Sequence, residues 1–230
     1  MPSGVVVVIP ALNEQQRIAA TVTAARTIPG VAAVVVADDG STDNTSAVAT
    51  ESGAYVVRLP RNRGKAAAMV AGAGAATAQG YADAPLLFLD ADLEQTAATA
   101  APLVAPVLDG RADMTIAILP PGTPGGGHGF VVRLASRGIV RATGWTPTQP
   151  LSGQRCIRRE LFDAVQPLAW GFGVETGLTI DALRRGATVL ECPVPIAHRV
   201  PGTSWRDQIH RARQYRDVWL ALAARRLRRD

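Results

Sequence analysis

Four short apolar runs, each followed by a polar cluster, constrain the fold of this chain more than any other feature. They lie at residues 5–9, 31–37, 55–59 and 86–89, and segments with helical signals separate them. Continuous β-branched runs are typical of strands that are buried on both faces, as in a parallel sheet. The alternation of strands and helices therefore predicts an α/β fold, with a mainly parallel central sheet flanked by helices.

The segments between these runs carry helix signals. Asn13 is a favourable N-cap residue, so we predict a helix over residues 14–26. The polar turn at residues 38–43 can cap a second helix that extends through Glu51, and an alanine-rich third helix ends near Ala78. Ligands of open α/β sheets bind beyond the carboxyl ends of the strands. The polar clusters that follow the four runs are therefore expected to converge on one site.

Asp90 and Asp92 end the fourth run and are separated by a single residue. Alternate side chains of a strand point the same way, so both carboxylates can face one site. Close carboxylates repel each other, and Mg²⁺ or Mn²⁺ would neutralise them, because hard oxygen ligands suit these ions. The pair can equally cap the following helix and close a turn, and the motif alone does not decide between these interpretations.

The second half of the chain is less regular. Strands are predicted at residues 114–119 and 188–192, and helices at 130–141 and 175–185. Residues 120–129 are rich in Gly and Pro, which favours irregular structure and leaves a binding loop and a connector as interpretations. We find no internal repeat and no clear linker, so the 230 residues are expected to form a single domain.

The composition is that of a globular protein, because 47% of the residues are apolar. The formal charge of +5 favours anionic partners such as nucleotides, phosphates or anionic lipid. Cys156 and Cys192 lie among apolar neighbours without a CxxC motif, so we expect core thiols rather than disulfides or a zinc site. Without a basic signal segment or an apolar stretch of about 20 residues, the expected location is the cytoplasm.

Residues 205–229 are predicted to form a helix whose polar face is strongly basic. Five residues supply its partial apolar face: Ile209, Ala212, Val218, Trp219 and Leu222. This face can pack on the domain or on a second subunit, or the helix can lie on an anionic membrane surface. No basic patch with interleaved aromatic residues occurs elsewhere, so we expect no nucleic-acid partner.

The polar clusters also carry recognisable motifs in a fixed order. Residues 9–14 read Ile-Pro-Ala-Leu-Asn-Glu, residues 38–43 read Asp-Asp-Gly-Ser-Thr-Asp, residues 62–65 contain Asn-x-Gly-Lys, and Asp-Ala-Asp follows at 90–92. Each motif alone is weak, but the four in this order and spacing resemble family 2 glycosyltransferases of the GT-A (Rossmann-like) fold. The resemblance is close over roughly the first half of the chain and continues more loosely to His198.

This resemblance implies that residues 1–92 bind a nucleotide-sugar donor. Lys65 would approach the diphosphate or the sugar, and Asp92 would ligate a Mg²⁺ or Mn²⁺ ion that stabilises the leaving nucleoside diphosphate. Acceptor-only carboxylates suit the hydroxyl and N–H groups of a nucleoside. The residues expected to contact the donor are Pro10, Ala11, Leu12, Glu14, Asp39, Lys65 and Asp90.

Residues 93–203 are expected to bind the acceptor, and this part is most similar to the glucosyl-3-phosphoglycerate synthase branch; residues 204–230 are the basic C-terminal helix. The motifs that carry this similarity are Gly-Gly-Gly at 125–127, Pro-Leu-Ser-Gly at 150–153, Gly-Phe-Gly-Val-Glu at 171–175 and Ala-His-Arg at 197–199. The resemblance adds His198 to Asp92 as a second protein ligand of the metal. The residues expected to face the acceptor are Gly127, His128, Arg133, Ser152, Gly153 and Glu175.

One departure from that branch concerns the acceptor. The synthases have Arg and Thr just after the triple glycine, where this chain has His128 and Phe130. Neither side chain offers a bidentate fork for a carboxylate or a phosphate, although Arg133 lies one helical turn further on. The departure argues against phosphoglycerate as the acceptor.

Together these features predict a metal-dependent glycosyltransferase that moves a hexose from a donor of the UDP-glucose or GDP-mannose type. The acceptor would be a small hydroxylated or phosphorylated molecule, and the catalytic residues would be Asp92, Lys65 and Glu175. Three alternatives remain: a polyprenyl-phosphate hexosyltransferase at the membrane surface, a sugar-phosphate nucleotidyltransferase, and a non-catalytic binding module. Retention or inversion at the transferred sugar stays open.

Overall fold

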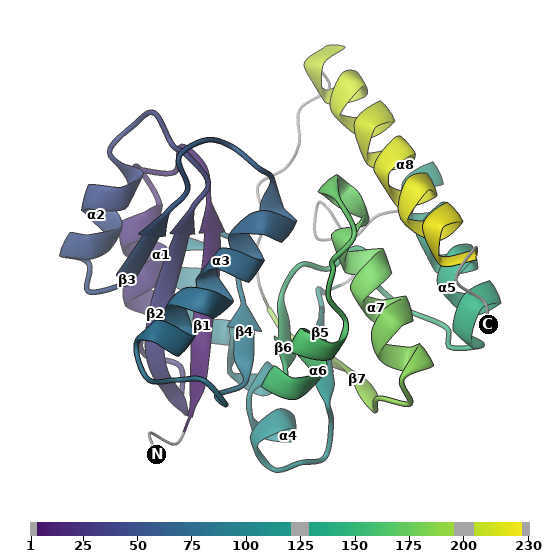
Figure 1. Ribbon diagram of the computed structural model, residues 1–230, viewed down its shortest axis with the longest axis horizontal. Coiled ribbons are helices and arrows are strands. Elements are labelled where there is room, and N and C mark those ends of the chain that lie inside the picture. The colour runs from purple at the N-terminus through teal and green to yellow at the C-terminus, as the bar shows by residue number, and fades with distance from the viewer. Residues whose placement is uncertain (1–3, 121–128, 196–204, 227–230) are drawn as a thin grey trace.

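Seven short segments pair into one sheet in a computed structural model that describes residues 4–120, 129–195 and 205–226, the last from 205 to 211 by its backbone. The strands are β1 (Val5–Ala11), β2 (Val31–Asp38), β3 (Tyr55–Arg58), β4 (Leu86–Phe88), β5 (Met114–Ile118), β6 (Arg155–Ile157) and β7 (Val189–Pro193). Their order in the sheet is β3-β2-β1-β4-β6-β5-β7 (Figure 1). Only β6 runs antiparallel to its neighbours, so the predicted α/β fold with a mainly parallel sheet is confirmed.

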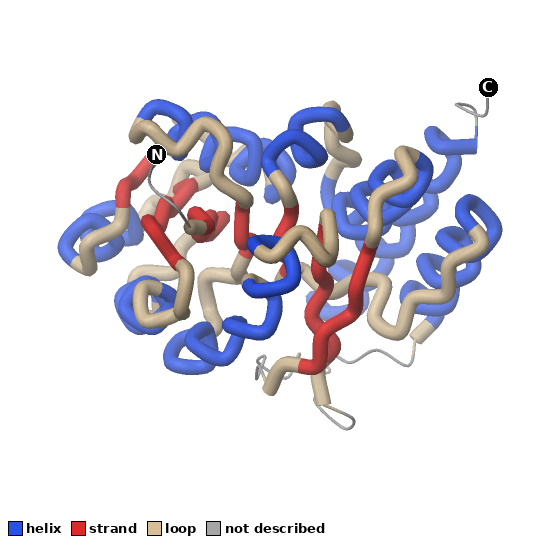
Figure 2. Tube along the Cα trace, turned by 90° about the horizontal axis from the view of Figure 1, so that it is seen from below, coloured by secondary structure: helices blue, strands red, loops and turns tan. Residues whose placement is uncertain are grey.

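Helices cover both faces of this sheet, as Figure 2 shows from below. The α-helices are α1 (Ile18–Ala25), α2 (Thr45–Glu51), α3 (Lys65–Ala78), α4 (Ala105–Leu108), α5 (Phe130–Thr143), α6 (Arg159–Ala164), α7 (Val174–Arg184) and α8 (Trp205–Arg226). Two 3₁₀ helices are η1 (Glu94–Leu103) and η2 (Gly171–Gly173). Side chains of α1, η1 and α4 fill the core on one face, and those of α3, α6 and α7 fill the core on the other.

The first apolar run forms the central strand, β1. Val5, Val7 and Ile9 enter one core, whereas Val6 and Val8 enter the other, and all five are fully buried. This alternation explains why the run is continuously apolar, since a strand between two layers of helices needs apolar side chains on both faces.

One local prediction is wrong, and one strand was not predicted. The first helix begins at Ile18 rather than at residue 14, because Asn13 adopts a left-handed backbone (φ 57°) and its side chain bonds the neighbouring loop instead of capping the helix. The sequence patterns also do not predict β6, which is only three residues long and contains the charged residue Arg155. The insertion of this strand between β4 and β5 brings the loop before it next to the end of β4.

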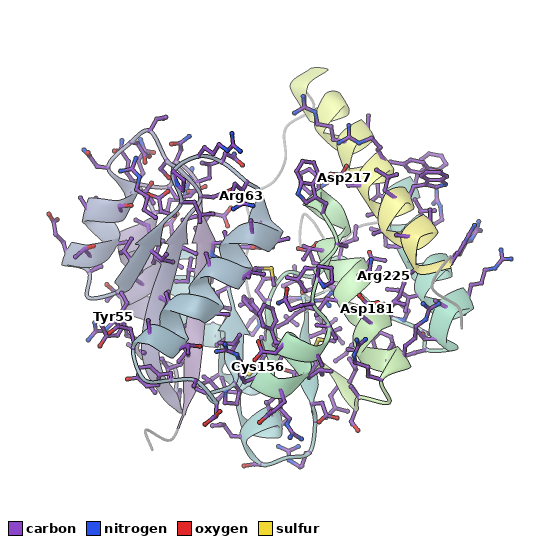
Figure 3. The ribbon with its side chains drawn as sticks, in the orientation of Figure 1. Tyr55, Arg63, Cys156, Asp181, Asp217 and Arg225 are labelled. Carbon is purple, nitrogen blue, oxygen red and sulfur yellow. The ribbon has the colours of Figure 1, made fainter. Side chains whose placement is uncertain are left out.

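The C-terminal helix α8 packs on the domain itself. Val218 and Leu222 are buried against α5 and α7, whereas Trp219 is 51% exposed, so its predicted place on the apolar face is wrong. A buried ion pair fixes the helix: Arg225 Nε donates to Asp181 Oδ1 of α7 at 2.9 Å (Figure 3). None of the helices in the described part of the chain has the length and apolar character that a membrane span requires.

Candidate active site

Polar side chains tie together the loops that follow β1 and β2. The backbone N–H of Asn13 donates to Ser41 Oγ at 2.9 Å, and Asn13 Oδ1 accepts the backbone N–H of Thr42 at 2.8 Å. The backbone N–H of Glu14 donates to Thr45 Oγ1 at 2.8 Å. Two of the polar clusters that we predict to converge therefore form one continuous edge at the carboxyl end of the sheet.

Asp39 fixes the backbone of the polar cluster that follows β3, at residues 62–65. Its buried carboxylate accepts the backbone N–H groups of Arg63 and Gly64, each at 2.7 Å. These contacts fix the start of α3 and hence the backbone position of Lys65. Each carboxylate oxygen has a second lone pair, so contact of Asp39 with a nucleoside stays a prediction.

Lys65 joins the two halves of the chain. Its Nζ lies 2.8 Å from Asp90 Oδ1 and 3.0 Å from Glu175 Oε1, in the first turn of α7. Burial opposes the charge on the ammonium, but the two carboxylates outweigh this effect and raise the pKa of Lys65. Lys65 is therefore a fixed cation at neutral pH rather than a base.

The two aspartates of the Asp-Ala-Asp motif have different surroundings. Asp90 accepts hydrogen bonds from Lys65 and, at 2.6 Å, from Nε2 of the buried Gln154. Asp92 is half-buried, and within the described residues no hydrogen bond or ion pair engages its carboxylate. Its charge acts on Arg17, whose pKa is raised mainly by Glu14 and to a smaller extent by Asp92. The carboxylate of Asp90 is therefore bound by other residues of the protein, whereas that of Asp92 is available to bind a ligand.

An open carboxylate at a strand end fits a Mg²⁺ or Mn²⁺ site. These ions take one or two protein carboxylates and complete their shell with waters and substrate phosphates. The described residues contain no cluster of three or more His, Cys, Asp or Glu side chains, and His198 lies outside them. Metal ligation by Asp92 and His198 stays a prediction.

The loop before β6 packs directly against the charged residues. A Cβ atom on Gly153 would lie 2.6 Å from Lys65 Nζ and 3.3 Å from both carboxylate oxygens of Asp90, so only glycine leaves this ion pair in place. Ser152 Oγ and Gln154 Oε1 are buried without a hydrogen-bond partner in the described part of the chain. Unpaired buried polar atoms are costly, so these two atoms are suited to bind a polar ligand.

Arg155 in β6 is a buried arginine that the sequence patterns do not single out. Its Nε donates to Ser152 O at 2.8 Å and its Nη1 donates to Thr179 Oγ1 at 2.7 Å. Burial lowers its pKa to about 10, with Glu175 and Glu191 opposing this effect, so it is charged at neutral pH. Arg155 therefore holds the loop before β6 against α7, behind Glu175.

A cavity of about 180 Å³ lies next to the ion pairs of Lys65. Its charged lining consists of Lys65, Asp90 and Glu175. The other lining residues are Val131, Leu151, Gly153, Phe172, Gln214 and Val218. Two of these residues, Gln214 and Val218, come from α8, so the C-terminal helix is part of the wall of the site.

Several predicted site residues lie outside this cavity. Pro10 and Ala11 end β1, and Leu12 is 39% exposed beyond it. Arg133 is exposed, and its guanidinium carbon lies 4.6 Å from the centre of the Phe130 ring. The predicted residues Gly127, His128 and His198 are outside the described part of the chain.

A mainly parallel sheet with a lysine and carboxylates gathered at its carboxyl edge is an arrangement typical of α/β proteins that bind ligands at this edge. The chain belongs to glycosyl transferase family 2, whose model matches residues 6–171. It is 32% identical over 202 residues to glucosyl-3-phosphoglycerate synthase from Mycobacterium tuberculosis, a match that covers 78% of this chain and 60% of the synthase. It is 29% identical over 206 residues to glycosyltransferase AglJ from Haloferax volcanii, with 88% and 66% covered.

Solved structures of the mycobacterial synthase have the same fold. The complex with phosphoglyceric acid has a TM-score of 0.76 at 28% identity and covers 97% of this chain and 80% of the synthase chain. The complex with Mn²⁺, UDP and phosphoglyceric acid has a TM-score of 0.75 at 29% identity, with 97% and 78% covered. These comparisons confirm the GT-A fold and the family 2 resemblance. The chain spans about 60% of the length of the curated synthase that it matches.

Proposed function

We propose that this chain is a metal-dependent hexosyltransferase that uses a nucleoside diphosphate sugar of the UDP-glucose or GDP-mannose type. The observation that carries the proposal is the Lys65 cation held between Asp90 and Glu175 at the carboxyl end of the sheet. Support comes from the related synthase, which has been solved with UDP and either Mn²⁺ or Mg²⁺. The acceptor is a small hydroxylated or phosphorylated molecule, and the cytoplasmic location is part of the same proposal.

In the proposed reaction, the bond between the anomeric carbon and the diphosphate oxygen breaks, and its electron pair passes to the diphosphate. An acceptor hydroxyl oxygen bonds to the anomeric carbon, and its proton passes through solvent to the released diphosphate. Lys65 offsets the negative charge that develops on the leaving diphosphate, which is an interaction stronger in the transition state than in the ground state. Glu175 orients the acceptor hydroxyl by accepting its hydrogen bond.

A metal ion held by Asp92 and His198 would add Lewis-acid stabilisation of the same diphosphate charge. Asp39 and Glu14 would accept hydrogen bonds from the nucleoside. In this proposal residues 1–92 bind the donor, residues 93–203 bind the acceptor, and residues 204–230 form the basic helix that closes the site.

A thermal-shift panel of UDP, GDP and TDP sugars, each with and without Mn²⁺, tests the proposal. A donor at about 100 times its Kd stabilises the folded state by about 2.7 kcal/mol. For a chain of this size that corresponds to a rise in Tm of roughly 5–10 °C. The active donor should give this shift only with the metal and should then release its nucleoside diphosphate. No shift with any sugar nucleotide would overturn the proposal, and binding without turnover would favour the non-catalytic module.

The surface of α8 is relevant to the alternative of a polyprenyl-phosphate hexosyltransferase at the membrane surface. Tyr215, Trp219 and Leu220 are each about half exposed, and Arg213 and Arg216 of the same helix are also exposed. This combination of aromatic and basic side chains suits an anionic lipid surface, and it could also pair with a second subunit. Co-sedimentation with anionic vesicles would support the polyprenyl-phosphate alternative, and light scattering on the eluted protein would detect a homodimer.

A further inference from the structure

We infer that Gln154 is a positioning residue for the proposed reaction, because it orients the carboxylate of Asp90 and, through this carboxylate, the ammonium group of Lys65. The inference rests on the proposed hexosyl transfer, in which Lys65 offsets the charge on the leaving diphosphate. Gln154 acts from behind the site rather than on a substrate, since it is only 1% exposed.

Both oxygens of the Asp90 carboxylate are bound by side chains from other elements. Lys65 Nζ, in the first turn of α3, lies 2.8 Å from Oδ1, and Gln154 Nε2 donates to Oδ2 at 2.6 Å. Hydrogen bonds to an ionised carboxylate are shorter and roughly twice as strong as those between neutral groups. Two such bonds on different oxygens fix the rotation of the carboxylate, so that Oδ1 stays directed at the ammonium group.

The position of the ammonium group depends on its partners, because a lysine carries its charge on a flexible four-carbon stem. Without the amide of Gln154, the carboxylate of Asp90 could turn and draw the ammonium group with it. Glu175 Oε1, at 3.0 Å, would still bind Lys65, so the charge would be displaced rather than released. A misplacement of about 1 Å near the reacting atoms can cost about 100-fold in rate. We therefore expect Gln154 to affect the rate of the chemical step.

The backbone of Gln154 is fixed by the sheet. Its carbonyl oxygen accepts the backbone N–H of Ala117 in β5 at 3.0 Å. The next residue, Arg155, pairs in register with Phe88 of β4 and with Ile116 of β5. A side chain can position another only when its own support is rigid, and a strand inserted between two others provides this support.

The residue after Gln154 supports the second partner of Lys65 in a related way. Arg155 Nη1 donates to Thr179 Oγ1 at 2.7 Å, and Thr179 Oγ1 donates to the carbonyl oxygen of Glu175 at 2.9 Å. Consecutive residues at the start of β6 thus hold the carboxylate of Asp90 and the backbone of Glu175. Gln154 is the one of the two that contacts a carboxylate of the ion pair directly, so its replacement should act on Lys65 most specifically.

A double-variant cycle tests the inference. Nucleoside diphosphate release by the full chain is measured with Mn²⁺ and UDP-glucose or GDP-mannose, whichever donor the wild type uses. Gln154→Leu should lower kcat by about 10- to 100-fold with little change in the KM of the donor, because the charge is displaced but not removed. Asp90→Ala should cost at least as much. Adding Gln154→Leu to Asp90→Ala should lower kcat by less than about threefold further, because the glutamine acts through the aspartate.

Gln149→Leu is the matched control. This glutamine lies in the same loop, but its amide bonds the backbone of Leu119, with Nε2 to the carbonyl oxygen at 2.9 Å and Oε1 to the N–H at 3.0 Å. Any effect of Gln149→Leu on kcat should therefore multiply with that of Asp90→Ala. Circular dichroism checks the fold, and Gln154→Met, with a side chain of nearly the same length, replaces the leucine variant if that variant is unfolded.

The outcomes separate the inference from the proposed function. If the wild type turns over a donor and the losses of Gln154→Leu and Asp90→Ala multiply in the double variant, the inference is overturned and the proposed function stands. Normal kcat in Gln154→Leu has the same meaning. If the wild type turns over no sugar nucleotide, the proposed function is overturned, and the inference with it.

Discussion

Lys65 Nζ lies 3.0 Å from Glu175 Oε1, and this ion pair joins the first turn of α3 to the first turn of α7. The Lys65 side chain is 30% exposed and that of Glu175 is 12% exposed, so the pair is better shielded from solvent than an ordinary surface ion pair. Together with the pairing of β4 and β6 in the sheet, this ion pair links the first part of the chain to the part that contains α7.

Replacing Lys65 by Met should lower kcat by about 10²- to 10³-fold, because it removes a preorganised charge from the leaving diphosphate. Steady-state kinetics with the donor found by thermal shift would measure the loss. Arg63→Ala is the matched control, since it removes a cation from the same loop while the backbone contact to Asp39 persists. A similar loss in both variants would mean that the loop acts through its overall charge.

The raised pKa of Lys65 should make the free energy of unfolding depend on pH. The pKa of Lys65 is raised above its ordinary value of about 10.4, so the folded state holds this proton more tightly than the unfolded state does. Its contribution to the free energy of unfolding should be complete below about pH 10.4 and should be lost only as the pH rises through the folded-state value. The free energy of unfolding in urea should differ between wild type and Lys65→Met by the same amount at every pH from neutral to about 10.4. A difference that already shrinks near neutral pH would contradict the pairing.

Gly153→Ala should impair catalysis more than stability. The added Cβ would lie 2.6 Å from Lys65 Nζ, and the flexible lysine end would move away from Asp90 at little structural cost. We expect a large loss of kcat with little change in the urea midpoint. Gly74→Ala in α3 is the control, because a Cβ there meets nothing within 4 Å and should stabilise the helix by about 0.5–1 kcal/mol. Normal kinetics in Gly153→Ala would show that the contact has no part in the reaction.

Asp92→Ala and His198→Ala should each abolish Mn²⁺-dependent nucleotide binding while the chain stays folded, because both residues are predicted metal ligands. Calorimetric titration of UDP with and without Mn²⁺ measures the effect, and circular dichroism checks the fold. Glu94→Ala is the control, since it removes a neighbouring carboxylate that pairs weakly with Arg17 at 3.8 Å. Unchanged binding in both variants would refute the metal assignment.

The ion pair between Asp181 and Arg225 should be important for the docking of α8. Asp181→Ala leaves a buried guanidinium without its carboxylate, which typically costs about 3–5 kcal/mol of stability. The double variant Asp181→Leu with Arg225→Met should recover much of this loss, since neither charge remains buried. Asp109→Ala, which breaks an exposed pair with Arg111, should cost less than about 1 kcal/mol. Urea unfolding curves compare the three; equal costs for the two single variants would contradict a structural role for the buried pair.

The two cysteines should differ in reactivity. Both are free thiols; Cys156 is fully buried in the core, as predicted, and Cys192 is only partly buried. Burial raises the pKa of both thiols, so at pH 8 each carries less thiolate than an ordinary cysteine. In the native protein, a thiol-reactive dye should label Cys192 slowly and Cys156 not at all. In concentrated guanidinium chloride the dye should label both. Rapid labelling of native Cys192→Ser protein would show that the core opens.

Local patterns predicted the four strands of the first half and the polar clusters at their ends, but they missed one short strand and the start of one helix. The four apolar runs predict β1 to β4 because burial on both faces requires unbroken apolar sequence. The start of α1 could not be predicted, since Asn13 is used by Ser41 and Thr42 of a loop far along the chain. Strand β6 was not predicted either, because three residues give no measurable periodicity.

The sequence alone determined the α/β class, the mainly parallel sheet and the gathering of four polar clusters at one edge, because apolar periodicity and strand direction fix these features locally. Only the tertiary structure decided which side chains meet. It engaged Asp90 and left the carboxylate of Asp92 open, it paired Lys65 with Glu175, and it placed Gln214 in the wall of the cavity. These contacts join residues far apart in the chain, and long-range contacts depend on the packing of β6, α7 and α8, which no local pattern records.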